Sequence, residues 1–282
     1  EDEARAGSSD AVRAYYDRYG DQERGRLVER VRGRVSFEVH KGFLTTFVGP
    51  GARVLEIGAG PARFTKVLAQ LGARVVVTDL SPVQLSLNEH YLSGMPEEAA
   101  VERRELLDIC DTSEFADGEF DVVLAFGGPL SYAFERVDEA MAGLLRITAD
   151  SGFVLASVMS LLGSWRHYLP AVTARAAVIG EDVNDRIFAT GDLRHDPASE
   201  HICRMFRARE ARELVERNGG TWVAASASNW GSLADEETVL ALEADPERWR
   251  HFVGNEIRAC AEPGALDGGT HILFAATPRR FS

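Results

Sequence analysis

Cysteine is scarce in this sequence of 282 residues. The chain has three cysteines, Cys110, Cys203 and Cys260, which are far apart and form no Cys-x-x-Cys pair. An odd number of widely spaced thiols is typical of a reducing compartment and provides neither a disulfide framework nor a thiolate zinc site. We therefore expect unpaired thiols and no metal site.

Long apolar runs are also missing. No stretch approaches the ~20 consecutive apolar residues that a transmembrane helix needs. The first ten residues, EDEARAGSSD, are acidic, whereas a secretory signal begins with basic residues followed by an apolar segment. These two absences predict a cytoplasmic protein that has no membrane partner.

Basic residues are outnumbered. The chain has 31 lysines and arginines against 44 aspartates and glutamates, which gives a formal net charge of −13. Such a surface repels polyanions unless a local basic stripe overcomes the repulsion. The densest basic stretch, residues 204–217, is interleaved with glutamates, as in a solvated helix with internal ion pairs. We expect no nucleic-acid partner and a small-molecule substrate.

The composition itself is that of a globular protein, with 45% hydrophobic and 27% charged residues. Strands that are buried on both faces and alternate with helices predict a parallel sheet of right-handed βαβ units. We therefore expect an α/β fold with a doubly wound sheet and helices on both faces. The sequence predicts strands at 53–57, 74–78, 120–126 and 152–158, a weaker one ending near Leu107, and helices at 61–71, 82–92 and 135–148.

The remaining segments flank this alternating pattern. One or two amphipathic helices are expected within 10–33, and another at 36–48 that ends at the turn Gly49-Pro50-Gly51. Later elements are predicted as helices at 207–218, 235–243 and 246–260, and strands at 220–228 and 270–276. The expected division is an N-terminal helical cap (1–48), a core (49–159), a lid insertion over the sheet (160–200) and the rest of the core (201–282), with a helical insertion at 229–268.

A glycine turn follows the first predicted strand, in the stretch VLEIGAGPARFT at 54–65. Gly58 and Gly60 let the backbone pass close to a ligand, and the helix that follows offers free N–H groups. A dinucleotide fingerprint, G-x-G-x-x-G, needs a third glycine where this chain has Arg63. The turn therefore predicts a cofactor site but disfavours a pyrophosphate.

An aspartate, Asp79, ends the next predicted strand about 20 residues beyond the glycine turn. A carboxylate in this place accepts hydrogen bonds from both hydroxyls of a ribose. An aspartate at a strand end is commonly only a helix cap, here for the helix that begins at Leu80-Ser81-Pro82. Its spacing from the glycine turn favours the binding role.

Together these motifs resemble those of class I S-adenosylmethionine-dependent methyltransferases. The first motif of that family, E/D-x-G-x-G-x-G, is matched by Glu56, Gly58 and Gly60 and departs at Ala62, where a glycine is usual. The D-L-S-P stretch at 79–82 continues the resemblance, which covers about 50–158 well and 201–276 loosely. It implies a mostly parallel seven-stranded sheet with an antiparallel last strand, and S-adenosylmethionine as cofactor.

The resemblance also implies further contacts to the cofactor. Asp108 would accept from the adenine amino group beside Ile109, although Asp111 and Glu114 compete for that role. The turn GGPL at 127–130 replaces the Asn/Asp-Pro-Pro-Tyr/Phe of enzymes that methylate planar nitrogens, which disfavours a nucleobase amine. The predicted cofactor-binding residues are Tyr16, Glu56, Gly58, Ala59, Gly60, Asp79, Leu80, Asp108, Ile109, Phe126 and Gly127.

Methyl transfer from a sulfonium is an in-line displacement, so the enzyme must chiefly hold the acceptor close to the methyl carbon. Where a base is needed, histidine suits neutral pH, and the candidates are His40, His167, His195 and His271. Each of the four also fits a structural role. His167 is the chosen catalytic candidate because it lies in the aromatic stretch WRHY of the predicted lid. Tyr19, Trp165 and Tyr168 are the predicted substrate-binding residues.

The leading hypothesis is therefore a methyltransferase that acts on oxygen, nitrogen or carbon of a small molecule, as in specialised metabolism. One alternative is a protein that binds S-adenosylmethionine without methyl transfer, as a sensor or an inactive partner subunit. Another is a nicotinamide-dependent oxidoreductase, which would need a pyrophosphate site at the turn that contains Arg63. All three fit the predicted fold, so the motifs decide between them.

Overall fold

The centre of the computed structural model, which describes residues 9–25, 28–197, 199 and 201–279, is a seven-stranded sheet. The spatial order is β3-β2-β1-β4-β5-β7-β6, in which β7 runs antiparallel to both β5 and β6 and the other pairs are parallel. This confirms the predicted α/β fold. The strands are β1 (Arg53–Ile57), β2 (Arg74–Asp79), β3 (Val101–Leu106), β4 (Phe120–Ala125), β5 (Thr148–Met159), β6 (Gly220–Ala227) and β7 (His271–Pro278).

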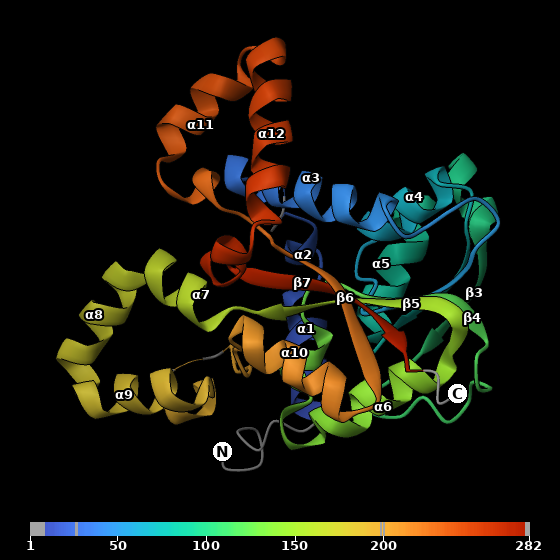
Figure 1. Ribbon diagram of the computed structural model, residues 1–282, viewed down its shortest axis with the longest axis horizontal. Coiled ribbons are helices and arrows are strands. Elements are labelled where there is room, and N and C mark those ends of the chain that lie inside the picture. The colour runs from blue at the N-terminus through green and yellow to red at the C-terminus, as the bar shows by residue number, and fades with distance from the viewer. Residues whose placement is uncertain (1–8, 26–27, 198, 200, 280–282) are drawn as a thin grey trace.

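Both faces of the sheet are buried because successive side chains of a strand point to opposite sides. In β1, Val54 packs in one apolar cluster, and Leu55 and Ile57 pack in the other. The first cluster is closed by helices α3 (Val31–Thr45) and α4 (Arg63–Gln70), and the second by α6 (Val137–Ile147) and α10 (Ala208–Arg217). Figure 1 shows α3 and α4 above the sheet and α6 and α10 below it. Helix α5 (Pro82–Leu92) flanks β2 and β3.

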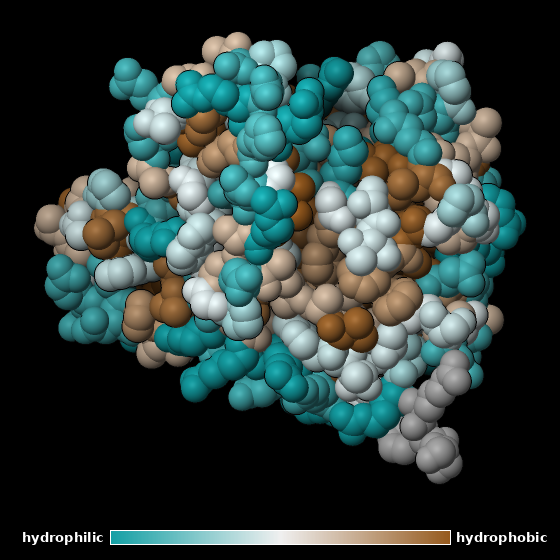
Figure 2. Space-filling view, turned by 45° about the horizontal axis from the view of Figure 1, so that its top comes forward, coloured by the Kyte–Doolittle hydropathy of each residue, from teal (hydrophilic) through white to brown (hydrophobic). Residues whose placement is uncertain are grey.

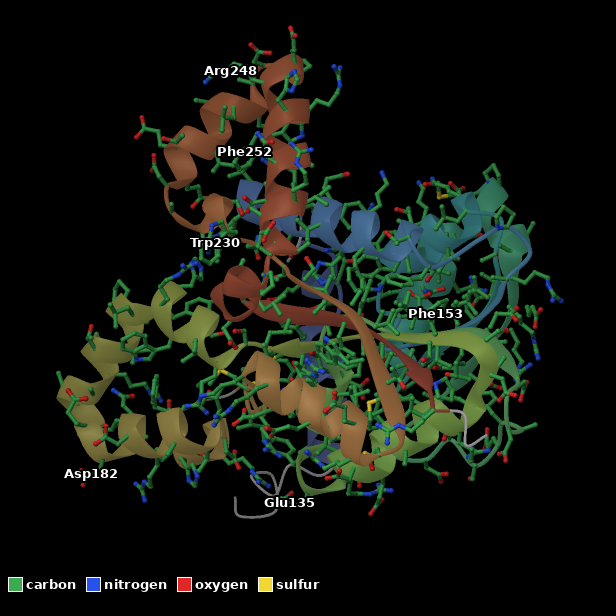
Figure 3. The ribbon with its side chains drawn as sticks, viewed as in Figure 1. Glu135, Phe153, Asp182, Trp230, Arg248 and Phe252 are labelled. Carbon is green, nitrogen blue, oxygen red and sulfur yellow. The ribbon has the colours of Figure 1, made fainter. Side chains whose placement is uncertain are left out.

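The N-terminal helices differ from the expected boundaries. Helix α1 spans Ser9–Tyr19 and α2 spans Gln22–Gly25, but α3 begins at Val31 rather than at residue 36. The reason is tertiary packing: Val31, Val35 and Val39 are buried against α11 (Glu236–Glu243) and α12 (Pro246–Cys260). Phe252 lies on the side of α12 that faces α11 (Figure 3). The first eight residues of the predicted cap, with most of its acidic start, lie outside the described part of the chain.

Three helices occupy most of the range predicted as a lid insertion: α7 (Leu161–His167), α8 (Leu169–Ile179) and α9 (Glu181–Thr190). They project to the left of the sheet in Figure 1. The chain returns to the core through bridges from Asp192 to Arg204 and from Ser160 to Phe206. The projecting lobe, α7–α9, carries several exposed apolar and aromatic side chains, namely Trp165, Tyr168, Leu169, Val178 and Phe188. Brown groups lie among teal ones on the left of the surface in Figure 2.

Short 3-10 helices complete the fold at η1 (Pro96–Ala100), η2 (Pro129–Tyr132), η3 (Phe134–Arg136), η4 (Leu193–His195), η5 (Gly231–Leu233) and η6 (Pro263–Gly268). Among the described residues, no helix combines the length and the apolar character that crossing a bilayer requires.

Candidate functional site

The glycine turn between β1 and α4 is held in a conformation that only small residues adopt easily. Gly58 has φ +70° and Gly60 has φ +53°, and a Cβ atom at Gly58 would lie 2.9 Å from Cγ of Pro129. The Ala59 N–H donates to the carbonyl oxygen of Thr78 at 3.0 Å, which ties the turn to β2. The backbone of the turn is therefore free to approach a ligand closely.

Asp79, at the end of β2, holds this turn in place. Its Oδ2 accepts from the Gly60 N–H at 3.0 Å, and its Oδ1 accepts from the Ser81 N–H at 2.9 Å. Each carboxylate oxygen has a second lone pair, so both can still accept from ribose hydroxyls. Burial raises the pKa of Asp79 to about 6, against the effect of the hydrogen bonds from Ser81 and Gly60.

A cavity of about 390 Å³, here called the cofactor cavity, opens beside the turn at the carboxyl ends of β1, β2 and β4. Ligands of open α/β sheets bind at this edge. The wall includes ten of the eleven residues predicted to bind cofactor: Tyr16, Gly58, Ala59, Gly60, Asp79, Leu80, Asp108, Ile109, Phe126 and Gly127.

Glu56 does not line the cofactor cavity. It lies beneath the turn, 2% exposed, and its Oε2 accepts from Oγ1 of Thr65 on α4 at 2.6 Å. Nδ2 of Asn88 donates to the same Thr65 oxygen at 2.9 Å, which extends the contact to α5. Burial raises the pKa of Glu56 to about 8, opposed by the Thr65 hydrogen bond and assisted by the nearby Asp79. The side chain thus braces the turn against α4.

Asp108 follows β3 and also lines the cofactor cavity. Its Oδ1 accepts from the Cys110 N–H at 2.9 Å, and its Oδ2 accepts from Oγ of Ser9 at 2.5 Å. Arg136, which sequence reasoning did not identify, lies 3.6 Å from the same carboxylate and also lines the cavity. The competing acids Asp111 and Glu114 do not line it.

Helix α1 covers the cofactor cavity. Oγ of Ser81 donates to Asp17 at 2.5 Å, and Nε2 of Gln84 donates to the carbonyl oxygens of Tyr16 and Gly20 at 3.2 and 3.0 Å. Ser81 and Gln84, which make these contacts to α1, follow Asp79 closely in the chain. The packing of α1 is therefore coupled to the cofactor site. No motif marks Gln84 as part of this contact.

A second and larger cavity of about 1150 Å³, here called the acceptor cavity, lies beside the first. Tyr16, Glu23, Phe64, Gly127 and Tyr132 line both cavities, so the two meet there. Helices α7–α9 supply a largely apolar wall. The predicted residues Tyr19, Trp165, His167 and Tyr168 all line the acceptor cavity.

Comparison with known proteins agrees with this geometry. Residues 54–152, which contain the glycine turn, Asp79 and Asp108, match a family model described as a methyltransferase domain. This chain carries a class I S-adenosylmethionine-dependent methyltransferase domain. A demethylmenaquinone methyltransferase from Corynebacterium urealyticum is 26% identical to it over 174 residues, which cover 57% of this chain and 68% of that protein.

Solved structures show that the methyltransferase shares its fold with distant proteins. The magnesium protoporphyrin IX methyltransferase of Synechocystis PCC 6803, solved with bound S-adenosylhomocysteine, matches with a TM-score of 0.59 at 13% identity, covering 97% of this chain and all of that one. The cyclase SpnF matches with a TM-score of 0.52 at 13% identity, covering 85% of this chain and 80% of that one. Both likenesses show the fold, and the family model supports S-adenosylmethionine as the cofactor.

The histidines of the methyltransferase occupy different parts of the acceptor cavity. His40 and His271 line it near Phe64 and Phe126, with the His40 and Phe126 ring centroids 5.1 Å apart. His167 lines it on α7, beside the Tyr168 ring, whereas His195 lines neither cavity.

A tyrosine pair and one more histidine lie at the junction of the two cavities of the methyltransferase. The Tyr16 and Tyr132 hydroxyls are 2.6 Å apart, and the Tyr132 hydroxyl lies 2.7 Å from Nε2 of His201. These contacts bring together α1, η2 and the segment after η4, which no sequence motif connects. Within the described ranges, no group of three His, Cys, Asp or Glu side chains is placed to hold a metal ion.

Proposed function

We propose that this methyltransferase transfers the methyl group of S-adenosylmethionine to a small, largely apolar molecule held in the acceptor cavity. The observation that carries the proposal is the junction between the two cavities at Tyr16, Phe64, Gly127 and Tyr132. A sulfonium held above Asp79 and the glycine turn would direct its methyl group toward that junction, as in-line transfer requires.

The acceptor wall supports the choice of a small molecule. Ligand pockets of a few hundred to about 1,000 Å³ suit single small molecules, and the acceptor cavity is of that order. Its outer wall comes from α7–α9, which lie outside the matched domain and can therefore be shaped for one specialised metabolite. The Corynebacterium and Synechocystis proteins are also named for small-molecule acceptors, demethylmenaquinone and magnesium protoporphyrin IX.

Cofactor binding is tested with S-adenosylhomocysteine by calorimetry and thermal unfolding. We expect the ligand to raise the melting temperature of the wild type. The Asp79→Asn variant should bind it at least tenfold more weakly, because hydrogen bonds to a charged acceptor contribute about 1.5–3 kcal/mol each. Asp111→Asn, the same change at an exposed aspartate outside the cofactor cavity, is the matched control and should bind normally.

Two results would contradict the proposal in different ways. Absence of any thermal shift at millimolar S-adenosylhomocysteine would remove the cofactor assignment. Normal binding with no methylated product from a broad panel of small aromatic hydroxyl, amine and carbon-acid acceptors would favour a protein that binds the cofactor without methyl transfer.

A further inference from the structure

One face of α3 forms a wall of the acceptor cavity. Arg32, Ser36 and His40 follow one another at the four-residue spacing of a helix stripe, and all three line the cavity. Each lies one position after a valine that packs against α11 and α12. Because each residue adds 1.5 Å to a helix, Arg32 and His40 are about 12 Å apart along the axis of α3. The acceptor cavity therefore extends over at least this length.

The His40 end of this stripe is the end next to the cofactor. The centroid of the His40 ring lies 5.1 Å from that of Phe126 and 5.6 Å from that of Phe64. Both phenylalanines line the cofactor cavity, and Phe64 lines the acceptor cavity as well. A methyl group that is transferred through the junction would therefore arrive near His40, and the Arg32 end of the stripe is the more distant one.

Arginine side chains gather at that distant end. Arg30 and Arg32 line the acceptor cavity, and Arg166 precedes His167, another residue of its wall, on α7. Burial lowers the pKa of His167, and the positive charges of these three arginines lower it further, whereas Glu236 raises it. Three positive charges and one negative charge thus act on His167. This excess is local, since the chain as a whole has a net charge of −13.

The guanidinium groups of Arg30 and Arg32 keep donors for a ligand. Nη1 of Arg32 lies 4.0 Å from Oε2 of Glu236, and within the described ranges its side chain forms no hydrogen bond. The Arg30 side chain has neither a hydrogen bond nor an ion pair with any described residue. Arg166 differs, because it donates to the carbonyl oxygen of Gly268 at 2.7 Å. The planar donor fork of an arginine matches two oxygens of a carboxylate or a phosphate.

The acids that line the acceptor cavity do not neutralise the arginine end. Asp196 is held by Arg175 through two contacts of 2.5 and 2.6 Å. Glu23 lies at the junction, where it lines the cofactor cavity as well. The Glu29 carboxylate is turned toward Gly25 of α2, where an added Cβ atom would collide with it. The arginine end of the cavity therefore keeps its positive charge.

We propose that the acceptor is an elongated apolar acid whose carboxylate or phosphate is bound by Arg30 and Arg32, an inference that rests on the proposed function. The methyl-accepting atom of such a molecule lies at the junction near His40, and its anionic oxygens lie about 12 Å away, at the start of α3. The apolar wall of α7–α9 packs against the part between them. The charge selects this orientation, because the reverse one would place the anion beside Glu23.

Matched probes test the arginine end in the S-adenosylhomocysteine complex of the full chain. They are phenylhexanoate, phenylpentyl phosphate and the neutral phenylhexanol, which share a phenyl ring and a flexible chain of similar length. In calorimetry at least one of the two anions should bind roughly tenfold more tightly than the alcohol, because it forms hydrogen bonds between charged groups. Added salt should weaken this preference. The anion that binds more tightly identifies the oxygen group that the arginines prefer.

Arg30→Gln/Arg32→Gln is the decisive variant, because glutamine keeps a polar side chain at both positions and removes the charge. We expect it to bind phenylhexanol like the wild type and to lose the preference for the anions. Arg30→Lys/Arg32→Lys should retain part of that preference, since lysine keeps the charge without the planar fork. Arg248→Gln/Arg250→Gln, the same loss of charge at two exposed arginines of α12 that line neither cavity, is the matched control and should keep it in full.

The possible results separate this inference from the function that it rests on. Failure of S-adenosylhomocysteine to bind to the wild type would overturn the proposed function and this inference together. Normal cofactor binding with anions that bind no more tightly than the alcohol, or with no probe bound at all, would overturn this inference alone. An anion preference that persists in Arg30→Gln/Arg32→Gln would do the same.

Discussion

Ala62 adopts a backbone conformation that suits glycine. Its φ is +66°, in the left-handed region, at the position where the family pattern usually has glycine. This conformation costs an L-residue about 1–2 kcal/mol. We therefore expect Ala62→Gly to raise the free energy of unfolding in urea by about 1 kcal/mol, after the larger chain entropy of unfolded glycine is deducted.

Ala69→Gly provides the matched control for that substitution. Ala69 lies within α4, where glycine costs about 1 kcal/mol relative to alanine, so this variant should be less stable than the wild type. Equal destabilisation by the two substitutions would show that the left-handed conformation at Ala62 carries no strain.

The site residues that the sequence predicts and those that it misses differ in physical origin. Gly58 and Asp79 follow from the local order of strand, turn and strand, which the sequence displays directly. Glu56 lies on the same side of β1 as Val54, toward α4, because strand side chains alternate, and so it braces the turn without lining the cavity. The position of His40 beside Phe126 depends on how α3 packs on the sheet, which no local pattern encodes.

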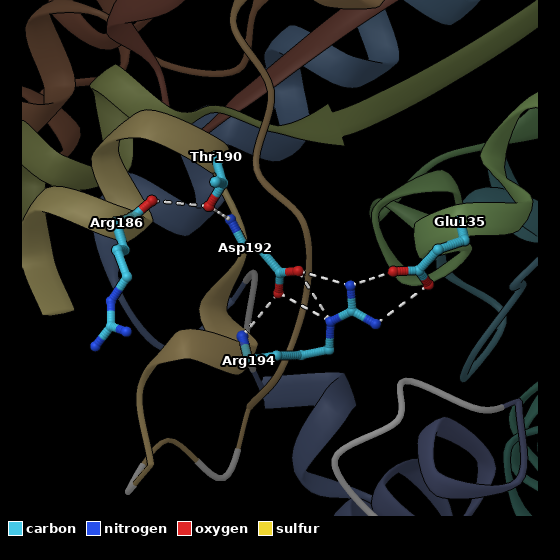
Figure 4. A network of polar contacts seen from close by, with 5 residues as sticks. All are labelled: Glu135, Arg186, Thr190, Asp192 and Arg194. Atoms are coloured by element: carbon cyan, nitrogen blue, oxygen red, sulfur yellow. Dashed lines mark hydrogen bonds and ion pairs between the residues drawn. The ribbon is translucent and has the colours of Figure 1, made fainter.

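At the scale of elements, Arg194 clamps the projecting helices to the core. Its guanidinium donates to Glu135 of η3 at 2.5 and 3.2 Å and to Asp192, just beyond the end of α9, at 2.7 Å (Figure 4). It also lies 4.2 Å above the Phe134 ring. Glu135 lines the cofactor cavity and Leu193 lines the acceptor cavity, so the clamp joins the walls of both.

We expect Arg194→Gln to loosen η4 and α9 relative to the core. A partly exposed, bidentate ion pair contributes about 1 kcal/mol, so hydrogen exchange over residues 181–195 should quicken roughly fivefold. Arg186→Gln is the control, because Arg186 is exposed on α9 and donates to the carbonyl of Asp182 within its own helix. If both variants exchange alike, the clamp does not hold the lobe.

The boundaries of α7–α9 illustrate why elements outside the core are harder to predict than those within it. Helices α4, α5 and α6 each come after a strand of the parallel part of the sheet, so the alternating pattern of the sequence predicts them. The chain leaves α9 at Gly191 with φ +75°, where a Cβ atom would lie 2.0 Å from the carbonyl oxygen of Met205. That close approach joins two segments that are separated along the chain, and only folding brings them together.

At the scale of the whole molecule, the alternation of strands and helices predicts the parallel half of the sheet, whose βαβ connections have a fixed hand. That alternation does not predict the place of β7 between β5 and β6, since residues 229–268 separate β6 from β7 along the chain. The same sheet carries two buried carboxyl groups, Glu56 on β1 and Asp79 at the end of β2, and both have a pKa above the ordinary value.

These two buried carboxyl groups make the stability of the ligand-free protein fall with rising pH. The folded chain holds their protons up to pKa values of about 6 for Asp79 and about 8 for Glu56, whereas the unfolded chain releases them near 4. Their contribution to the free energy of unfolding is therefore fully present below pH 4. As the pH rises, the contribution of Asp79 is lost up to about pH 6 and that of Glu56 up to about pH 8. Each loss amounts to at most about 1.4 kcal/mol per pH unit.

Glu56→Gln isolates the upper part of this effect. Between pH 6 and 8, Asp79 becomes fully ionised in the folded protein, so most of the slope, which is the change of the wild-type unfolding free energy with pH, comes from Glu56 in this range. An uncharged glutamine at position 56 should therefore reduce that slope. The amide oxygen that this substitution introduces can still accept from Thr65, which preserves the brace. Urea unfolding at half-unit pH steps measures the slope, and Glu97→Gln, a change at a carboxyl whose pKa is lowered by Gln70, should leave it unaltered. A slope that Glu56→Gln does not change would mean that Glu56 is already ionised in the folded protein and that its burial is balanced by the hydrogen bonds around it.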